Sequence, residues 1–187
     1  MTRRADPDDG RRRCRWASGD ALLATYHDFE WGRPIATDAG HLERMALEVF
    51  QCGLSWRIVL VKRRAIRAAF GGFKPERVAG MTGRDVDRLC RNAEIIRNRR
   101  KIEATIYNAG RFVAIARDHR SYRRWLNPLP AGTRRQREAL VPLFHERFKF
   151  MGPETVQCYL MGVGKIPPKH DRACWCRVYP RTAGSAR

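Results

Sequence analysis

The stretch LEVFQCGLSW, residues 47–56, is mostly apolar and yet carries one carboxylate, Glu48. An ionised carboxylate is rarely left in apolar surroundings, because burying it without a partner is unfavourable. Glu48 therefore has two interpretations. It either forms a solvent-exposed ion pair with Arg44, four residues earlier, contributing about 0.3–0.5 kcal/mol, or it points into a pocket. The stretch by itself leaves both open.

The same stretch lies at the junction of two predicted helices. Apolar residues recur at helical spacing over residues 41–50, and Gly53 interrupts the pattern. Ser55 has the side chain of a good N-cap, and it predicts a second helix that reaches about residue 70.

Further helical signals follow along the chain. Thr82 and Asp85 have the spacing of a helix cap, and residues 93–117 are typical of a tight hairpin that leads into a long helix. Residues 137–150 form another helical piece, and Gly152-Pro153 fits the start of the next helix. No alternating pattern strong enough for a sheet is present, so we predict an all-helical (all-α) fold.

The length and charge limit the domain organisation and the partner. The 187 residues suit one compact domain, which we place at residues 14–178, between a disordered basic leader at 1–13 and a flexible tail at 179–187. The formal charge of +19 favours a polyanion, most often nucleic acid. No long apolar segment or signal peptide is visible, so we expect a cytoplasmic, nucleoid-associated monomer and no membrane.

Cysteine and histidine residues gather near both ends of the chain. Cys14 and His27 lie near the start, and His170, Cys174 and Cys176 lie near the end. Two thiolates and two imidazoles make a closed tetrahedral zinc site, in which Cys176 competes with Cys174 for one position. The alternative is that these are core thiols and solvated imidazoles. Core positions are expected for the three remaining cysteines, Cys52, Cys90 and Cys158.

Aromatic residues crowd around the first pair of possible ligands. They are Trp16, Tyr26, Phe29 and Trp31, with Trp56 further along. In a basic protein such rings suggest stacking on a base, worth about 1–3 kcal/mol per base. The alternative for any one tryptophan is a large core residue.

Six segments together resemble the 3-methyladenine DNA glycosylase I family. They are CRW (14–16), YHDFEWGRP (26–34), LEVFQCGLSW (47–56), EIIRNRRKI (94–102), FKFMGPETVQCYLMGVG (148–164) and H-x3-C (170–174). The resemblance implies the helix-hairpin-helix DNA glycosylase fold. It also implies one structural zinc ion that joins the N- and C-terminal segments, with ligands Cys14, His27, His170 and Cys174.

The resemblance further implies an activity and its residues. The family hydrolyses the bond between 3-methyladenine and deoxyribose after the nucleotide has been flipped out of double-stranded DNA. Glu48 matches the carboxylate that contacts the base, and four aromatic residues match the pocket, namely Tyr26, Trp56, Trp16 and Trp31. No lysine stands out as a Schiff-base nucleophile, so we expect a monofunctional enzyme without strand cleavage. The alternative function is a zinc-stabilised nucleic-acid-binding protein without catalysis.

Binding to DNA is expected at the hairpin and at the junction after Glu48. In the helix-hairpin-helix superfamily that the motifs resemble, the hairpin offers backbone N–H groups to phosphates. Three side chains here would add positive charge: Arg97, Arg99 and Lys101. Leu54, beside Gly53, is the expected wedge, its alternative being a core leucine.

Two departures from the family pattern carry expectations of their own. Val49-Phe50 replaces a smaller or more polar pair, and Phe50 either narrows the pocket or repacks the core. Glu94 stands where a hairpin glycine is common, and a positive φ there would cost about 1 kcal/mol.

Overall fold

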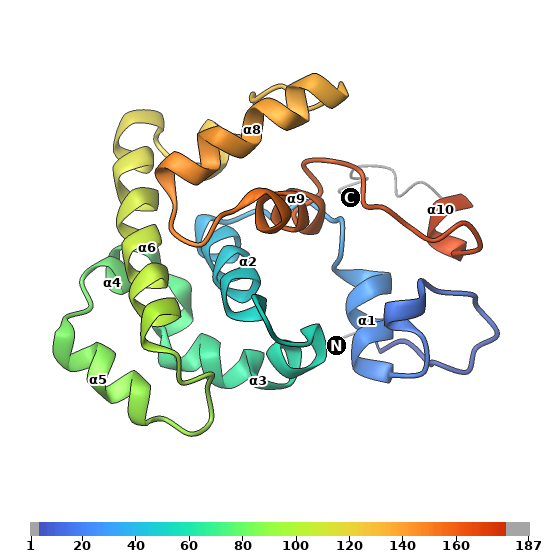
Figure 1. Ribbon diagram of the computed structural model, residues 1–187, viewed down its shortest axis with the longest axis horizontal. Helices are drawn as coiled ribbons and strands as arrows, with labels where there is room; N and C mark the ends of the chain where they lie inside the picture. The colour runs from blue at the N-terminus through green and yellow to red at the C-terminus, as the bar shows by residue number, and fades with distance from the viewer. Residues whose placement is uncertain (1–3, 179–187) are drawn as a thin grey trace.

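The computed structural model describes residues 4–178, and within that range it is entirely helical, which confirms the predicted all-α class (Figure 1). The first three residues and the predicted tail at 179–187 lie outside the described residues. The helices are η1 (Arg15–Ala17), α1 (Ala21–Phe29), α2 (Asp38–Gln51), α3 (Trp56–Ala69), η2 (Gly71–Phe73), α4 (Pro75–Ala79), α5 (Gly83–Arg91), α6 (Arg99–His119), α7 (Tyr122–Leu126), α8 (Arg134–Arg147), α9 (Pro153–Gly162) and α10 (Trp175–Val178).

Helix α2, which carries Glu48, is the centre of the molecule. Every residue from His41 to Phe50 is buried, and the helix packs against α3, α6 and α9 (Figure 1). It begins at Asp38, earlier than the predicted residue 41, because the Thr37 hydroxyl accepts a hydrogen bond from the Gly40 N–H (3.1 Å) and caps it. Because neighbouring helices cover α2 on several sides, its polar face is buried as well as its apolar face. This is why charged residues of α2 are buried.

The junction between α2 and α3 has the predicted form. Gly53 lies at φ = 76°, a left-handed conformation that favours glycine, and lets the chain turn. The Ser55 hydroxyl then accepts from the Ile58 N–H (3.3 Å), so Ser55 is the N-cap of α3 as predicted. This tight turn places Glu48 and Trp56 on neighbouring helices.

The two ends of the described chain lie side by side (Figure 1). The return of the chain after α9 depends on Gly164, at φ = 70°, where a Cβ atom would lie 2.8 Å from the Gly32 carbonyl oxygen. Residues 4–13, predicted to belong to a disordered leader, contact the domain at several points, among them a hydrogen bond from the Trp175 N–H to the Arg12 carbonyl (2.8 Å). The Ala5 N–H donates to Thr25 Oγ1 (3.0 Å), and Arg13 is buried against Asp28.

Helices α5 and α6 flank residues 92–98, where the hairpin was predicted. Asp85 caps α5 together with Thr82, as predicted. The condition for strain at Glu94 is not met, because Glu94 does not have a positive φ. Its N–H donates to the Asn92 side chain (2.9 Å), so an asparagine turn makes a glycine unnecessary. The Lys62 ammonium holds the same turn through the carbonyls of Ala93 and Glu94 (3.1 and 3.0 Å).

Candidate active site and metal cluster

A cavity of about 370 Å³ opens between η1, α1, α2, α3 and α9. It is lined by all five residues predicted for the base pocket: Trp16, Tyr26, Trp31, Glu48 and Trp56. They come together from η1, α1, α2 and α3 and, for Trp31, from the turn after α1. The structure therefore places the predicted carboxylate and the predicted aromatic rings around one space.

The aromatic rings form a continuous wall. Tyr26 lies between Trp16 and Trp56, with ring centroids 6.1 and 5.2 Å away, and Trp16 meets Trp31 edge to face at 5.2 Å. Tilted and edge-to-face contacts are the favoured arrangements of aromatic pairs. Trp16 is still 38% exposed, so the wall is only partly covered and a flat ligand can enter beside it.

Glu48 lines the same cavity as the aromatic rings, and Arg44 is buried close to it. Glu48 is 7% exposed and Arg44 4% exposed, so the interpretation of a solvent-exposed ion pair is wrong. Burial raises the pKa of Glu48 to about 7, although the charge of Arg44 opposes this rise. Burial likewise lowers the pKa of Arg44 to about 10, against the attraction of Glu48. Near neutral pH the pocket thus holds a carboxylate that titrates and a cation that does not.

Phe50 does not narrow the pocket. It is fully buried and its ring meets Phe70 edge to face at 6.0 Å, on the core side of α2. Val49 is also fully buried, and neither residue lines the cavity. Val49 and Phe50 thus belong to the core and not to the lining of the cavity around Glu48.

The cavity also has lining residues that were not predicted for it. Cys158 and Met161, three apart on one face of α9, also line the cavity. The prediction of a core position for Cys158 is wrong, because its residue is exposed at the pocket. Their spacing on a helix that follows Gly152-Pro153 was the available signal. The remaining lining residues that were not predicted are Leu23, Gln51, Ser55 and Arg57.

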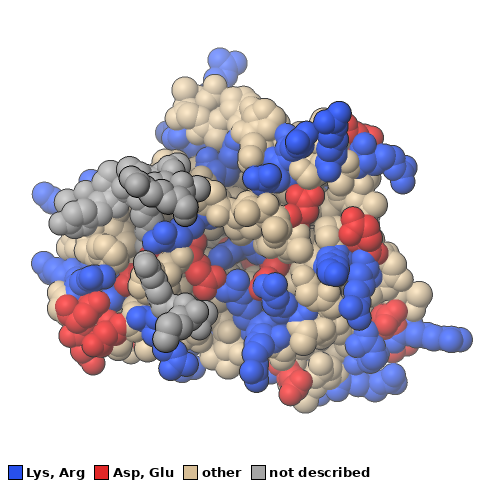
Figure 2. Space-filling view, turned by 180° about the vertical axis from the view of Figure 1, so that it is seen from behind, with Lys and Arg blue, Asp and Glu red and all other residues tan. Residues whose placement is uncertain are grey.

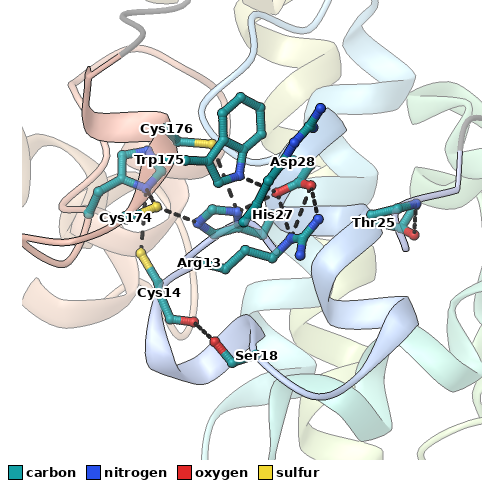
Figure 3. Close-up of polar contacts among 12 residues, drawn as sticks. Arg13, Cys14, Ser18, Thr25, His27, Asp28, Cys174, Trp175 and Cys176 are labelled. Atoms are coloured by element: carbon teal, nitrogen blue, oxygen red, sulfur yellow. Dashed lines mark hydrogen bonds and ion pairs between the residues drawn. The ribbon is translucent and has the colours of Figure 1, made fainter. Parts of the chain in front are cut away.

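Beside the pocket, a cluster of four side chains joins the two ends of the domain (Figure 3). Cys14 comes from the segment before η1, His27 from α1, and His170 and Cys174 from the segment before α10, and their ligand atoms all lie within 4.8 Å of one another. The Cys14 and Cys174 sulfurs are each 3.5 Å from His170 Nδ1, and the Cys174 sulfur is 3.4 Å from His27 Nε2. The four side chains are gathered at one point and His27 is fully buried, which favours a metal site over scattered core thiols and solvated imidazoles, although both thiols are buried as that alternative also expects.

The spacing and the donor set fit a zinc ion. Zinc–sulfur and zinc–nitrogen bonds of about 2.3 and 2.0–2.1 Å in a tetrahedron separate sulfur from nitrogen by about 3.5 Å. The observed separations of 3.4 and 3.5 Å agree with this value.

A second layer of contacts orients His27 (Figure 3). Its Nδ1 lies 2.8 Å from Asp28 Oδ1, and this partner directs Nε2 toward Cys174. Arg13 holds the Asp28 carboxylate with its Nη2 (2.8 Å), and the Trp175 indole donates to it (3.3 Å). The Cys176 sulfur lies 3.9 Å from the same Nδ1 that faces Asp28, so Cys176 belongs to a separate group from the four.

The cluster and the pocket share their walls. Trp31, which lines the pocket, lies edge to face with His170 at 4.9 Å, and Trp16 meets His27 at 5.3 Å. Cys14 directly precedes η1, the short helix that carries Trp16. Any group bound by the four side chains would therefore support two of the pocket's tryptophans.

The residues predicted to contact DNA differ in their exposure and in their partners. Leu54 is half-buried and Gly53 exposed, at the turn beside the pocket. Arg97 and Arg99 are exposed at the start of α6, although Arg99 is ion-paired with Asp87. Figure 2 shows Lys and Arg spread widely over one face of the molecule, with fewer acidic residues, some of which gather in a patch at the lower left.

The prediction that Lys101 faces a phosphate is wrong. Lys101 is buried, and its Nζ donates to the backbone carbonyls of Phe50 (3.0 Å) and Cys52 (2.5 Å). The last carbonyls of a helix have no partner within the helix. Lys101 satisfies them at the end of α2 and thereby fixes the turn that follows Glu48.

A model of the methyladenine glycosylase family matches residues 16–142. The chain belongs to the methyladenine glycosylase family. This confirms the family predicted from the sequence motifs. DNA-3-methyladenine glycosylase 1 from Escherichia coli (strain K12) is 33% identical, with 90% of this chain and 97% of the relative covered.

Solved structures of the family share the fold. A crystal structure of 3-methyladenine DNA glycosylase I is 35% identical, with a TM-score of 0.78 and coverage of 88% of this chain and 99% of the other. A structure that addresses 3-methyladenine recognition by the Staphylococcus aureus family member is 29% identical, with a TM-score of 0.75 and coverage of 85% and 98%. Among the helices described here, none combines the length and apolar character needed to cross a membrane.

Proposed function

We propose that this chain is a DNA glycosylase that hydrolyses the bond between 3-methyladenine and deoxyribose in alkylated double-stranded DNA. The observation that carries the proposal is the arrangement of Glu48 with Tyr26, Trp16, Trp31 and Trp56 around one cavity. A base must leave the helical stack to reach such a cavity, so the substrate is a flipped nucleotide.

The chemistry of the pocket suits an alkylated adenine. Adenine methylated at N3 carries a positive charge in DNA and is already a good leaving group. Aromatic faces attract such a cation, and Glu48 would accept hydrogen bonds from its exocyclic amine. The pocket therefore prefers the damaged base to neutral adenine by charge and by stacking.

The reaction proposed is hydrolysis without strand cleavage. Strand cleavage of the Schiff-base type needs a lysine at the reacting sugar, and among the described residues none lines the cavity. Lys101, the nearest in sequence to the hairpin, is engaged with the carbonyls of Phe50 and Cys52. We therefore assign the enzyme a monofunctional role. Leu54, at the turn between α2 and α3, would be the wedge that fills the gap left by the flipped base.

The four-residue cluster would hold one structural zinc ion. Cys14, His27, His170 and Cys174 supply a closed set of four ligands, which leaves no position for a reacting water. The ion would join the chain ends and thereby hold η1 and α1 in place beside the pocket. It supplies folding energy and takes no part in the reaction.

The contact with DNA would rest on the hairpin and its arginines. Arg97 and Arg99 would position the phosphate backbone without reading sequence, as is usual for such contacts. The protein would act as a monomer on double-stranded DNA.

The direct test is to incubate the purified protein with methylated DNA and follow released bases by chromatography. We expect release of 3-methyladenine by the wild type and a reduced rate in Glu48→Gln. Glu146→Gln, an exposed position on α8, is the matched control and should excise normally. Duplex binding without any base release, by folded protein of verified metal content, would instead support the non-catalytic nucleic-acid-binding protein.

A further inference from the structure

The side chain of Arg44 lies directly behind the pocket wall. It comes from α2, one helical turn before Glu48, and does not itself line the cavity. Its guanidinium carbon is 4.7 Å from the centroid of the Tyr26 ring and 5.7 Å from that of Trp56. A cation at these distances from two aromatic faces is attracted to both.

Arg44 also contacts the polar part of the wall. Its Nη1 donates a hydrogen bond to the Tyr26 hydroxyl, and this fixes the direction in which that hydroxyl can donate. Gly162 of α9 makes room for the group: a Cβ atom there would lie 3.4 Å from Arg44 Cδ and 3.5 Å from Glu48 Oε1. The glycine thus brings the backbone of α9 close to both charged side chains.

The neighbouring carboxylate of Glu43 is ion-paired with Arg63 and Arg67, and no acidic side chain of the described residues forms an ion pair with the buried Arg44. Glu48 is the carboxylate whose charge acts most strongly on it. The two side chains are spaced four apart on one helix, and helical geometry keeps them on the same face.

We propose that Arg44 is a positioning residue of the active site, which holds Tyr26 and Trp56 from behind and supplies a positive charge that favours the ionised form of the buried Glu48. The role of Glu48 and the aromatic wall in base binding rests on the proposed function. The electrostatic part concerns Glu48 alone and holds whatever the substrate. Arg44 acts through these residues and does not touch the base.

The charge and the hydrogen bond of Arg44 can be separated by two substitutions. Arg44→Gln removes the charge and keeps an N–H donor for Tyr26. Arg44→Lys keeps the charge and loses the planar group that spans both rings. Arg64→Gln, an exposed position on α3, is the matched control.

The measurement that isolates the charge is a titration of the Glu48 carboxyl carbon by NMR, assigned with the help of Glu48→Gln. Burial raises the pKa of Glu48 to about 7 in the wild type, with Arg44 opposing the rise. We expect the midpoint to increase by about 1 unit or more in Arg44→Gln. It should stay near the wild-type value in Arg44→Lys and in the control.

Other groups that act on this pair are the same in all the variants. They are Cys158 and Tyr159 on α9, Arg63 on α3, Tyr26 on α1, and Cys52 at the end of α2.

Base excision supplies the second readout. In Arg44→Gln the acidic limb of the pH–rate profile should move to higher pH together with the titration midpoint of Glu48. In Arg44→Lys the limb should stay in place while the rate falls by about 10-fold or more, because Tyr26 and Trp56 lose their support.

A Glu48 midpoint in Arg44→Gln equal to that of the control would overturn the electrostatic role, and full activity of Arg44→Lys would overturn the positioning role. The Lys variant decides alone if the Gln variant does not fold, since a changed midpoint there also contradicts the proposal. Wild-type protein that shows the expected titration but releases no base would refute the proposed function and leave this inference standing.

Discussion

Tyr26 and His27 are consecutive residues of α1, and they serve two different sites: Tyr26 lines the cavity, while His27 belongs to the cluster of four possible metal ligands. The same alternation occurs at the start of the chain, where Cys14 precedes Trp16 by two residues. Short stretches of backbone therefore couple the order of the pocket to the order of the cluster.

The first prediction concerns the metal. The purified protein should contain about one zinc ion per chain, and the ion should be lost in Cys14→Ala and in His170→Ala. Binding of 3-methyladenine should fall together with zinc content when a chelator is added, because η1 and α1 lose their anchor. Metal analysis and base binding on the same samples check this.

Two cysteine variants are the controls for the metal prediction. Cys90→Ala, on α5 and outside the cluster, should keep its zinc. Cys176→Ala should also keep it, since Cys176 lies in a separate group that shares His27. Zinc retained in both Cys14→Ala and His170→Ala would contradict the ligand set.

The second prediction is the pH dependence of base excision. Because burial raises the pKa of Glu48 to about 7, the carboxylate is protonated at pH 5.5 and ionised at pH 8. A protonated Glu48 has lost the negative charge that attracts the cationic base and strengthens its hydrogen bonds, so the rate should rise with pH through about 7. Glu48→Gln should excise about 10–100-fold more slowly at pH 8, and its profile should be flat across this range. A wild-type limb unchanged by the substitution would assign the titration to another group.

The third prediction concerns stability in acid. His41 is buried in α2, with Nδ1 3.0 Å from the Tyr159 hydroxyl, and burial lowers its pKa to about 4. An unfolded histidine titrates near 6.5, so the stabilising contribution is complete above pH 6.5 and is lost as pH falls toward 4. The wild type should lose about 2 kcal/mol from this group between pH 7.5 and pH 5.

His41→Asn, which keeps a polar group near the position of Nδ1, isolates this contribution. Urea unfolding at the two pH values should show a smaller loss in the variant than in the wild type. Equal losses in both proteins would mean that His41 is not the residue responsible.

The fourth prediction separates two basic residues of the hairpin region. Lys101→Met should lower the free energy of unfolding by about 1–3 kcal/mol, because the last carbonyls of α2 lose their donor. Arg97→Ala should leave stability unchanged and weaken duplex binding, with a salt slope smaller by about 1. Denaturant unfolding and binding at several salt concentrations measure the two effects. A normal salt slope in Arg97→Ala would remove Arg97 from the DNA interface.

Much of the helical pattern and the pocket could be predicted from the sequence. Capping residues such as Ser55 and Thr82 act on their own helix, so local spacing reveals them. The five pocket residues were found because they occur in short motifs that resemble the family's. Those motifs also favoured a pocket position for Glu48 over a surface position, because the helical pattern around Glu48 is compatible with both.

The contacts that local spacing could not reveal are those of long side chains between helices. Lys101 lies in a run of basic residues typical of a solvated surface, yet the packing of α6 on α2 turns it inward. Arg44 was interpreted as a surface partner for the same reason, because periodicity gives the face of a helix but not what covers that face. Cys158 shows the opposite error, an exposed residue on a helix with apolar neighbours.

The clasp between the chain ends has a consequence for biosynthesis. Cys14 and His27 leave the ribosome about 140 residues or more before their partners His170 and Cys174. The helical core around α2 can form beforehand, but η1 and α1 acquire their final neighbours only after residues 170–174 have been made. A nascent chain would therefore carry an open, inactive pocket until that segment is released.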